Sequence, residues 1–64
     1  MTNKVKEFRE EANLSQEKLA EMSGVSRNTI SSLETKENVN ITYLVMKKIS
    51  MALNKTVQEI FFEE

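Results

Sequence analysis

Hydrophobic positions along the 64-residue chain recur at the spacings of helices rather than of strands. Val5, Phe8 and Ala12 follow the i, i+3, i+7 pattern of an amphipathic helix. Asn13 comes next, and asparagine accepts the left-handed conformation in which helices often end. The pattern predicts a first helix over residues 3–12.

Two serines precede the next hydrophobic runs at positions that suit helix N-caps, where a side-chain oxygen accepts a hydrogen bond from a free backbone amide. Ser15 precedes residues 16–22, and Ser26 precedes residues 27–34. We expect the inward-facing residues of these two segments to be Leu19, Ala20, Met22, Ile30 and Leu33. The pattern therefore predicts a second and a third helix.

The chain's only glycine, Gly24, lies between these two predicted helices. Glycine accepts a positive φ without the clash that a Cβ atom causes. A helix-turn-helix unit joins two helices at about 90 to 120° through three or four residues. We expect this unit over residues 15–34, with the small Ala20 where its two helices approach most closely.

The C-terminal half of the chain predicts two more helices. Residues 35–40 are polar and lack periodicity, which is typical of a loop. Thr42 is placed to cap a helix that ends near Asn54, and Thr56 and Glu59 have the spacing of a capping box. The apolar stripe of the fourth helix is Val45, Met46, Ile49, Ala52 and Leu53, and the fifth carries Ile60, Phe61 and Phe62.

Composition indicates one small globular domain over residues 1–64, because 39% of residues are apolar, 30% are charged and none is proline. A chain of this length buries only about 60% of its unfolded surface. Cysteine and histidine are absent, so no disulfide, thiolate metal site or cofactor is expected. The N-terminus does not resemble a signal peptide, and the longest apolar stretch is residues 43–46, so we expect a cytoplasmic protein.

Catalysis is not expected from this set of residues. Without His, Cys or Asp, and with a single Gly, the chain cannot build a Ser-His-Asp or Cys-His site or a phosphate-binding loop. The glutamates, such as Glu7, Glu10 and Glu11, recur at spacings that place them on solvated helix faces beside lysine. We therefore predict no catalytic residue and no metal ligand.

The segment QEKLAEMSGVSRNTISSLE resembles the helix-turn-helix of the Cro and phage-repressor family, also called the Xre family. The matching positions are Gln16, Leu19, Ala20, Gly24, Val25, Ser26, Ile30, Leu33 and Glu34. Residues 49–53 and 57–60 are similar to the family's fourth and fifth helices. The family often has glycine at Asn54 and proline at Ile41, where this chain departs from it. The resemblance implies an all-α, compact, five-helix, lambda-repressor-like DNA-binding domain.

The family resemblance implies that the third helix enters the DNA major groove. The N-terminal half of such a helix meets the base edges, which makes Arg27, Asn28, Ser31 and Ser32 the candidate base-contacting residues. Arginine can hold guanine O6 and N7, and asparagine can hold adenine N6 and N7. The alternatives for Arg27 are a phosphate contact and a solvated surface cation.

The second helix would then lie across the DNA backbone. Gln16, at the start of that helix, resembles the family's phosphate-anchoring glutamine, although it can also be an ordinary exposed residue. Thr29 lies close enough to reach the backbone or a thymine methyl group. The full set of candidate phosphate contacts is Gln16, Ser26, Thr29, Lys36, Asn38, Asn40 and Thr42.

Similar repressors carry an arginine on the first helix and a glutamate at the end of the third, and these two pair across the fold. Arg9 and Glu34 occupy the matching places here. The resemblance implies a structural ion pair, so we expect Arg9→Ala to lower stability more than DNA affinity.

A net charge of −1 is the main objection to DNA binding, because strongly basic domains are the usual expectation. The placement of the charges answers it, since Glu10, Glu11 and Glu21 can lie away from the groove and Arg27 and Lys36 near it. We expect weak non-specific binding and a modest salt dependence.

Small DNA-binding domains of this type usually dimerise to bind half-sites about 34 to 36 Å apart. The C-terminal segment, residues 54–64, has more large apolar residues than one face of a short helix can bury. Ile60 and Phe61 also suit the core. The candidate interface residues are Ile41, Tyr43, Val57, Phe61 and Phe62.

The sequence thus predicts a sequence-specific, homodimeric transcriptional regulator, more a repressor than an activator, which binds a two-fold symmetric operator in double-stranded DNA. No membrane partner and no small-molecule effector is expected. The alternative is a protein-interaction module on the same fold, such as an antitoxin component or an anti-repressor.

Overall fold

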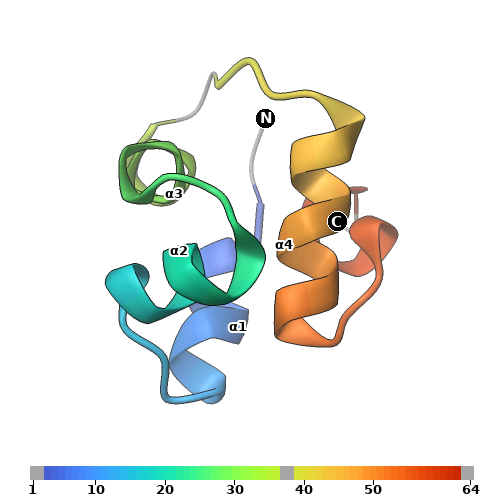
Figure 1. Ribbon diagram of the computed structural model, residues 1–64. Helices are drawn as coiled ribbons and strands as arrows, with labels where there is room; N and C mark the ends of the chain where they lie inside the picture. Colours follow the sequence, from blue (N-terminus) through green and yellow to red (C-terminus); the bar gives the residue numbers. More distant parts are fainter. Residues whose placement is uncertain (1–2, 37–38, 63–64) are drawn as a thin grey trace.

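The computed structural model of the chain describes residues 3–36 and 39–62. Within these residues the chain forms four α-helices and one short π-helical segment, with no strand (Figure 1). The elements are α1 (Val5–Glu11), α2 (Gln16–Ser23), α3 (Arg27–Thr35), α4 (Tyr43–Leu53) and η1 (Gln58–Phe62). The predicted all-α architecture of five helical segments is confirmed.

The predicted N-caps are present in the structure. The Ser15 hydroxyl accepts a hydrogen bond from the Lys18 amide at 2.9 Å, and the Ser26 hydroxyl accepts one from the Thr29 amide at 3.1 Å. Thr42 caps α4 in the same way, accepting from the Val45 amide at 3.2 Å. Each cap satisfies one backbone amide that the first turn of a helix leaves free.

Three helix ends turn through the left-handed region of backbone space. Gly24 has φ 74°, and the two asparagines at the predicted ends, Asn13 and Asn54, have φ 59° and 56°. Glycine reaches this region without a Cβ clash, and asparagine tolerates it better than most residues. These ends confirm the prediction for Asn13, Gly24 and Asn54.

Helix α1 is shorter than the predicted 3–12, because it begins at Val5 and ends at Glu11. Asn3 lies outside the helix, where its side-chain oxygen accepts a hydrogen bond from the Val5 amide at 3.0 Å. Its side-chain nitrogen donates to the Leu33 carbonyl at 2.9 Å, which ties the N-terminal segment to α3.

One core lies between the helices. Helix α2 packs against α3 and α4, and α1 packs against α3 and η1 (Figure 1). The buried apolar residues are Val5, Leu19, Val25, Ile30, Leu33, Ile49, Leu53, Ile60 and Phe61. The Lys4 amide donates to the Ile60 carbonyl at 2.8 Å, so the start of the described chain is held against η1.

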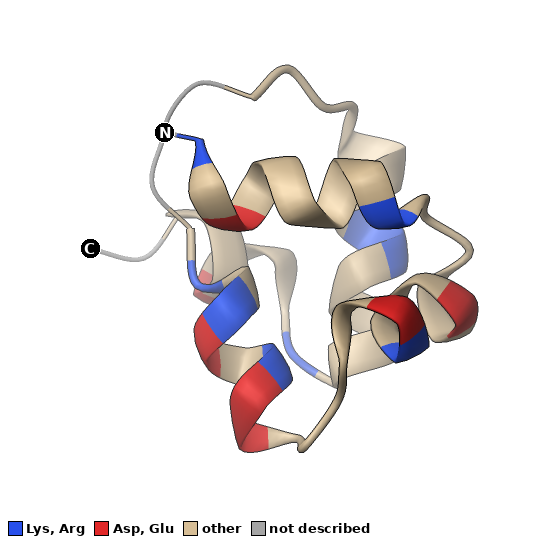
Figure 2. Cartoon of the chain, turned by 90° about the vertical axis from the view of Figure 1, so that its left-hand side faces the viewer, with Lys and Arg blue, Asp and Glu red and all other residues tan. Residues whose placement is uncertain are grey.

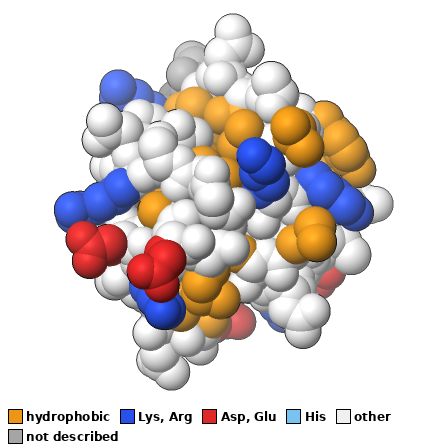
Figure 3. All heavy atoms as spheres, in the orientation of Figure 1, with side chains coloured by type: hydrophobic (Ala, Val, Ile, Leu, Met, Phe, Trp, Pro, Cys, Tyr) orange, Lys and Arg blue, Asp and Glu red, His pale blue; other side chains and the backbone are white. Residues whose placement is uncertain are grey.

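The expectation that Met22 faces inward is wrong, because 49% of this residue is exposed at the end of α2. Other large apolar residues are exposed on α4, and Figure 3 shows hydrophobic and basic side chains together on the face where α4 lies. The core therefore does not use all of the chain's large apolar residues.

Charged residues are unevenly distributed over the helices. Helix α3 carries only Arg27 and Glu34 along its length, and Lys36 follows it. Figure 2 shows α3 without charge along its middle, whereas α1 and α2 carry several acidic segments. A net charge of −1 therefore does not describe the surface around α3.

Candidate nucleic-acid interface

The first turn of α3 presents the two strongest candidates for reading bases. Arg27 and Asn28 are exposed, while Ile30 and Leu33 of the same helix are buried in the core. Among the described residues, no hydrogen bond or ion pair engages the side chain of Arg27 or Asn28. Their donors and acceptors are therefore available to a ligand.

Ser31 and Ser32 lie one turn further along α3 and are half-buried. Their backbone carbonyls accept hydrogen bonds at the C-terminal end of α3. The Thr35 hydroxyl donates to the Ser31 carbonyl at 2.8 Å, and the Lys36 amide donates to the Ser32 carbonyl at 2.9 Å. These two serines are less exposed than Arg27 and Asn28.

The corner before α3 is set by backbone conformation rather than by lack of space. The Gly24 amide donates to the Ala20 carbonyl at 2.9 Å, and a Cβ atom built on Gly24 meets nothing within 4 Å. Val25 follows and is buried, which anchors the turn in the core. The positive φ at Gly24 is therefore the feature that lets the chain reverse between α2 and α3.

The other candidate phosphate contacts lie before, along and after α3 and in the segment that leads into α4. The hydroxyls of Ser26 and Thr29 lie 2.9 Å apart and form a hydrogen bond. Asn40 and Thr42 are exposed at the approach to α4, and Lys36 is exposed just after α3. Thr42 accepts a hydrogen bond through its hydroxyl, which leaves its O–H hydrogen free to donate. Asn38, also predicted as a phosphate contact, lies outside the described residues.

A groove of about 320 Å³ lies between α3 and the segment that leads into α4. Asn28, Thr29 and Ser32 form one wall, and the opposite wall comes from residues 39–42 together with Val45. The predicted interface residue Ile41 lines this groove and is half-buried, so it lies beside the candidate DNA-contacting residues.

The predicted ion pair joins α1 to the end of α3. Arg9 Nε donates to Glu34 Oε2 at 2.7 Å, and Arg9 Nη2 donates to Glu34 Oε1 at 3.1 Å. The side chains are 12% and 2% exposed. Arg9 Nη1 also donates to the Leu14 carbonyl at 2.5 Å, so the guanidinium fixes the turn between α1 and α2 as well.

Gln16 belongs to the same network, which the sequence did not indicate. Its Nε2 donates to Glu34 Oε1 at 3.1 Å, and its residue is half-buried at the start of α2. Burial raises the pKa of the Glu34 carboxyl, but hydrogen bonds from Arg9 and Gln16 outweigh it and hold this pKa below its usual range. Glu34 is therefore a carboxylate that positions Gln16.

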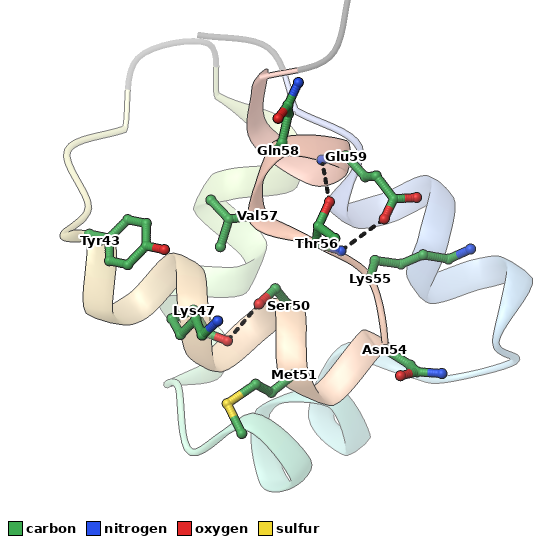
Figure 4. A pocket seen from close by; sticks show the side chains of 10 residues that line it. All are labelled: Tyr43, Lys47, Ser50, Met51, Asn54, Lys55, Thr56, Val57, Gln58 and Glu59. Carbon is green, nitrogen blue, oxygen red and sulfur yellow. Dashed lines mark hydrogen bonds between the residues drawn. The ribbon is translucent and has the colours of Figure 1, made fainter.

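The predicted dimer residues do not form one cluster. Tyr43 and Val57 line a hollow of about 530 Å³ between α4 and the segment leading into η1 (Figure 4). Phe62 is exposed at the end of η1. The prediction that Phe61 belongs to the dimer interface is wrong. Phe61 is 3% exposed and packs in the core, so it offers no surface to a second copy.

Two further observations concern residues 3–36 and 39–62. No helix there is both long and apolar enough to span a bilayer. No group of three or more acidic side chains is gathered there in a way that suits a metal ion.

Comparison with known proteins gives one family and several relatives. A family model described as Helix-turn-helix matches residues 5–60. The uncharacterized HTH-type transcriptional regulator YgzD of Bacillus subtilis is 39% identical over 64 residues, which cover 100% of this chain and 96% of the relative. Control protein C.SmaI of Serratia marcescens is 40% identical over 60 residues, which cover 94% of this chain and 70% of the relative.

A third relative is an uncharacterized HTH-type transcriptional regulator of Archaeoglobus fulgidus. It is 40% identical over 65 residues, which cover 100% of this chain and 90% of the relative. The similarity extends through α1, α4 and η1 and is not confined to the helix-turn-helix unit.

Proposed function

The chain belongs to the Xre/Cro-type helix-turn-helix family of DNA-binding transcriptional regulators, and from this membership we propose that it represses transcription as a homodimer on a two-fold symmetric operator. The family is one of regulators and not of enzymes. The proposed place of action is the cytoplasm, where a bacterial or archaeal operator lies. The proposed domain extends over residues 1–64, with dimerisation through residues 54–64.

The exposed pair Arg27 and Asn28 at the start of α3 is the observation that carries the proposal. The N-terminal residues of a recognition helix are the ones that meet base edges in the major groove. The guanidinium of Arg27 suits the two acceptors of guanine, O6 and N7. The amide of Asn28 donates to N7 and accepts from N6 of adenine.

Phosphate contacts around this helix would fix its register on the duplex. Gln16 is proposed as one anchor: Glu34 takes one N–H of its amide, which leaves the second N–H for a phosphate oxygen. The hydroxyls of Ser26, Thr29 and Thr42 and the exposed Lys36 and Asn40 surround the same helix. Ser31 and Ser32 are proposed as short contacts to base edges.

Dimerisation is proposed through the side of the molecule where η1 and the start of α4 meet. Tyr43 and Val57 line one hollow there, and Phe62 is an exposed aromatic residue on η1. Exposed aromatic side chains are common anchors of interfaces. Ile41 would extend this interface toward the DNA.

Selection of bound duplexes from a random pool, followed by footprinting, tests DNA binding and symmetry together. We expect a two-fold symmetric site with half-sites about one helical turn, roughly 34 to 36 Å, apart. On the selected duplex, Arg27→Ala should lower affinity by about tenfold or more and relax the preference at one base pair, since a bidentate contact discriminates by roughly 1 to 3 kcal/mol. The matched control is Lys6→Ala, which removes an exposed cation on α1.

Three results would overturn the proposal or part of it. An absence of any enriched duplex would exclude sequence-specific DNA binding. If replacement of Gln16, Arg27 and Asn28 leaves regulation intact while Val57→Ser and Phe62→Ser abolish it, the chain acts as a protein-interaction module. Sedimentation of the wild type as a monomer at high micromolar concentration would remove the homodimer.

A further inference from the structure

The exposed apolar residues of α4 and of the end of α2 form a surface that DNA binding does not use. We name it the α2–α4 surface and define it as Met22, Leu44, Lys48, Met51 and Ala52. Leu44 is 62% exposed and Met51 is 72% exposed. Single exposed apolar residues are normal, but four of the five large ones in the described chain lie on α4 or at the end of α2.

This surface is concave between the two helices. Met22 and Ser23 at the end of α2 and Lys48, Met51 and Ala52 on α4 line a hollow of about 520 Å³. Leu44 lies one turn before Lys48, at the i, i+4 spacing that places both on one face of the helix. The hollow shares no lining residue with the groove beside Asn28. Met51 separates it from the hollow that holds Tyr43 and Val57.

The charge of this surface is positive. Helix α4 carries no carboxylate and two exposed lysines, of which Lys48 lines this hollow and Lys47 lines the neighbouring one. Glu21 precedes Met22 in the sequence, but its carboxylate pairs with Lys18 at 2.9 Å on α2. Figure 3 shows basic side chains standing among hydrophobic ones on this face.

We propose that the α2–α4 surface binds an acidic amphipathic helix of a partner protein. Apolar residues of that helix would enter the hollow between Met22 and Met51, and its glutamates or aspartates would face Lys47 and Lys48. Thioether side chains are unbranched and flexible, so they fit a partner's apolar residues without a fixed shape. An amphipathic helix in an apolar groove is an established way for proteins to recognise peptides.

Charge complementarity selects this occupant over the two others that a DNA-binding homodimer suggests. A second copy docked by the same surface would bring a second set of α4 lysines to the interface, and α4 supplies no carboxylate to face them. A DNA backbone would use the lysines but leave Met22, Leu44 and Met51 without a partner. Only an acidic and apolar ligand uses both kinds of residue.

The test uses the full chain and a synthetic helical peptide of about 16 residues, with leucines at i, i+4, i+7 and i+11 and glutamates beside them. The control peptide has the same leucines and lysines in place of the glutamates. Titrations followed by backbone amide NMR should shift signals of α4 and of the end of α2 with the acidic peptide. Its affinity should exceed that of the control peptide by about tenfold and fall as salt is added.

Variants of exposed residues separate this surface from the rest of the molecule without touching the core. Met22→Glu and Lys48→Glu should each weaken acidic-peptide binding by about tenfold or more. Lys6→Glu on α1 is the charge-matched control and should change it by less than about twofold. Circular dichroism verifies that every variant remains folded.

Three results would overturn the inference. The first is no saturable shift with about 1 mM acidic peptide, which is the weak limit of specific affinity. The second is dissociation of a wild-type dimer by Met22→Glu, which assigns the surface to a second copy. The third is a loss of duplex affinity in Lys48→Glu as large as that of Arg27→Ala, which assigns it to DNA. Failure of DNA binding itself would leave the peptide result standing, because the peptide titration contains no DNA.

Discussion

Removal of the Arg9 guanidinium should destabilise the domain by about 3 to 5 kcal/mol, the usual cost of leaving one buried charge without its partner. Arg9→Ala deletes both hydrogen bonds to Glu34 and the one to the Leu14 carbonyl. Glu34, 2% exposed, then keeps only the hydrogen bond from Gln16. A domain of 64 residues has a total stability of only about 3 to 10 kcal/mol, so the variant should be largely unfolded or close to it.

Urea denaturation followed by circular dichroism measures this effect. With a slope of about 1 kcal/mol per molar urea, the midpoint should fall by about 3 to 5 M. Because Arg9→Ala alone can fail to fold, the double variant Arg9→Met with Glu34→Met is the informative partner. Replacing both charges by apolar side chains is often close to neutral, so the double variant should recover most of the lost stability.

The pH dependence provides a second measurement of the same pair. The pKa of Glu34 is lowered in the folded state, so its contribution is complete above the pKa of the unfolded chain, about 4.3, and is lost as the pH falls through the lowered value. Without Arg9, burial keeps the pKa of Glu34 from falling. The difference in stability between wild type and Arg9→Ala should therefore shrink from pH 7 to pH 3.

Two outcomes would refute this reasoning. A double variant as unstable as Arg9→Ala would show that the lost stability does not come from the stranded carboxylate. An Arg9→Ala variant that keeps its melting temperature and loses DNA affinity would make Arg9 a DNA contact.

Three shorter predictions follow from other features. Gly24→Ala should lower stability by about 1 to 2 kcal/mol through its positive φ alone, whereas Asn54→Gly should raise it by up to about 1 kcal/mol; urea midpoints measure both. Backbone and hydroxyl hydrogen bonds from Thr56 lower the pKa of Glu59, so wild type should lose stability below about pH 4.5 more steeply than Glu59→Gln in thermal scans at several pH values. The slope of log affinity for duplex against log salt should be about −2 per protomer, because two described cations, Arg27 and Lys36, flank α3.

Features set by neighbouring residues could be predicted from the sequence. The caps at Ser15, Ser26 and Thr42 depend on a hydroxyl three residues before a free amide. The capping box of Thr56 and Glu59 is likewise local, with both hydrogen bonds at 3.0 Å (Figure 4). Such contacts require no knowledge of the tertiary structure, which is why the element order was predictable.

Contacts between distant residues were harder to predict. The resemblance to the family indicated the pair Arg9–Glu34. It did not indicate that the Gln16 amide donates to the same carboxylate, which is 18 residues away in the sequence. Phe61 suited both the core and the interface in the sequence, and only the tertiary structure shows that it is buried while Phe62 is exposed. The segment η1 is π-helical, with hydrogen bonds from i to i+5, which the sequence did not indicate.

The uneven distribution of charged residues over the helices explains how an acidic chain can bind both proposed ligands, a DNA duplex and an acidic helix. Acidic residues are concentrated on α1 and α2, the start of α3 presents Arg27, and α4 presents only Lys47 and Lys48. The groove beside Asn28 and the hollow between Met22 and Met51 have no residue in common. On these proposals a duplex and an acidic helix would occupy different surfaces, so a partner could bind while the regulator remains on its operator. A partner that instead displaced the regulator would have to cover the start of α3 or disrupt the dimer.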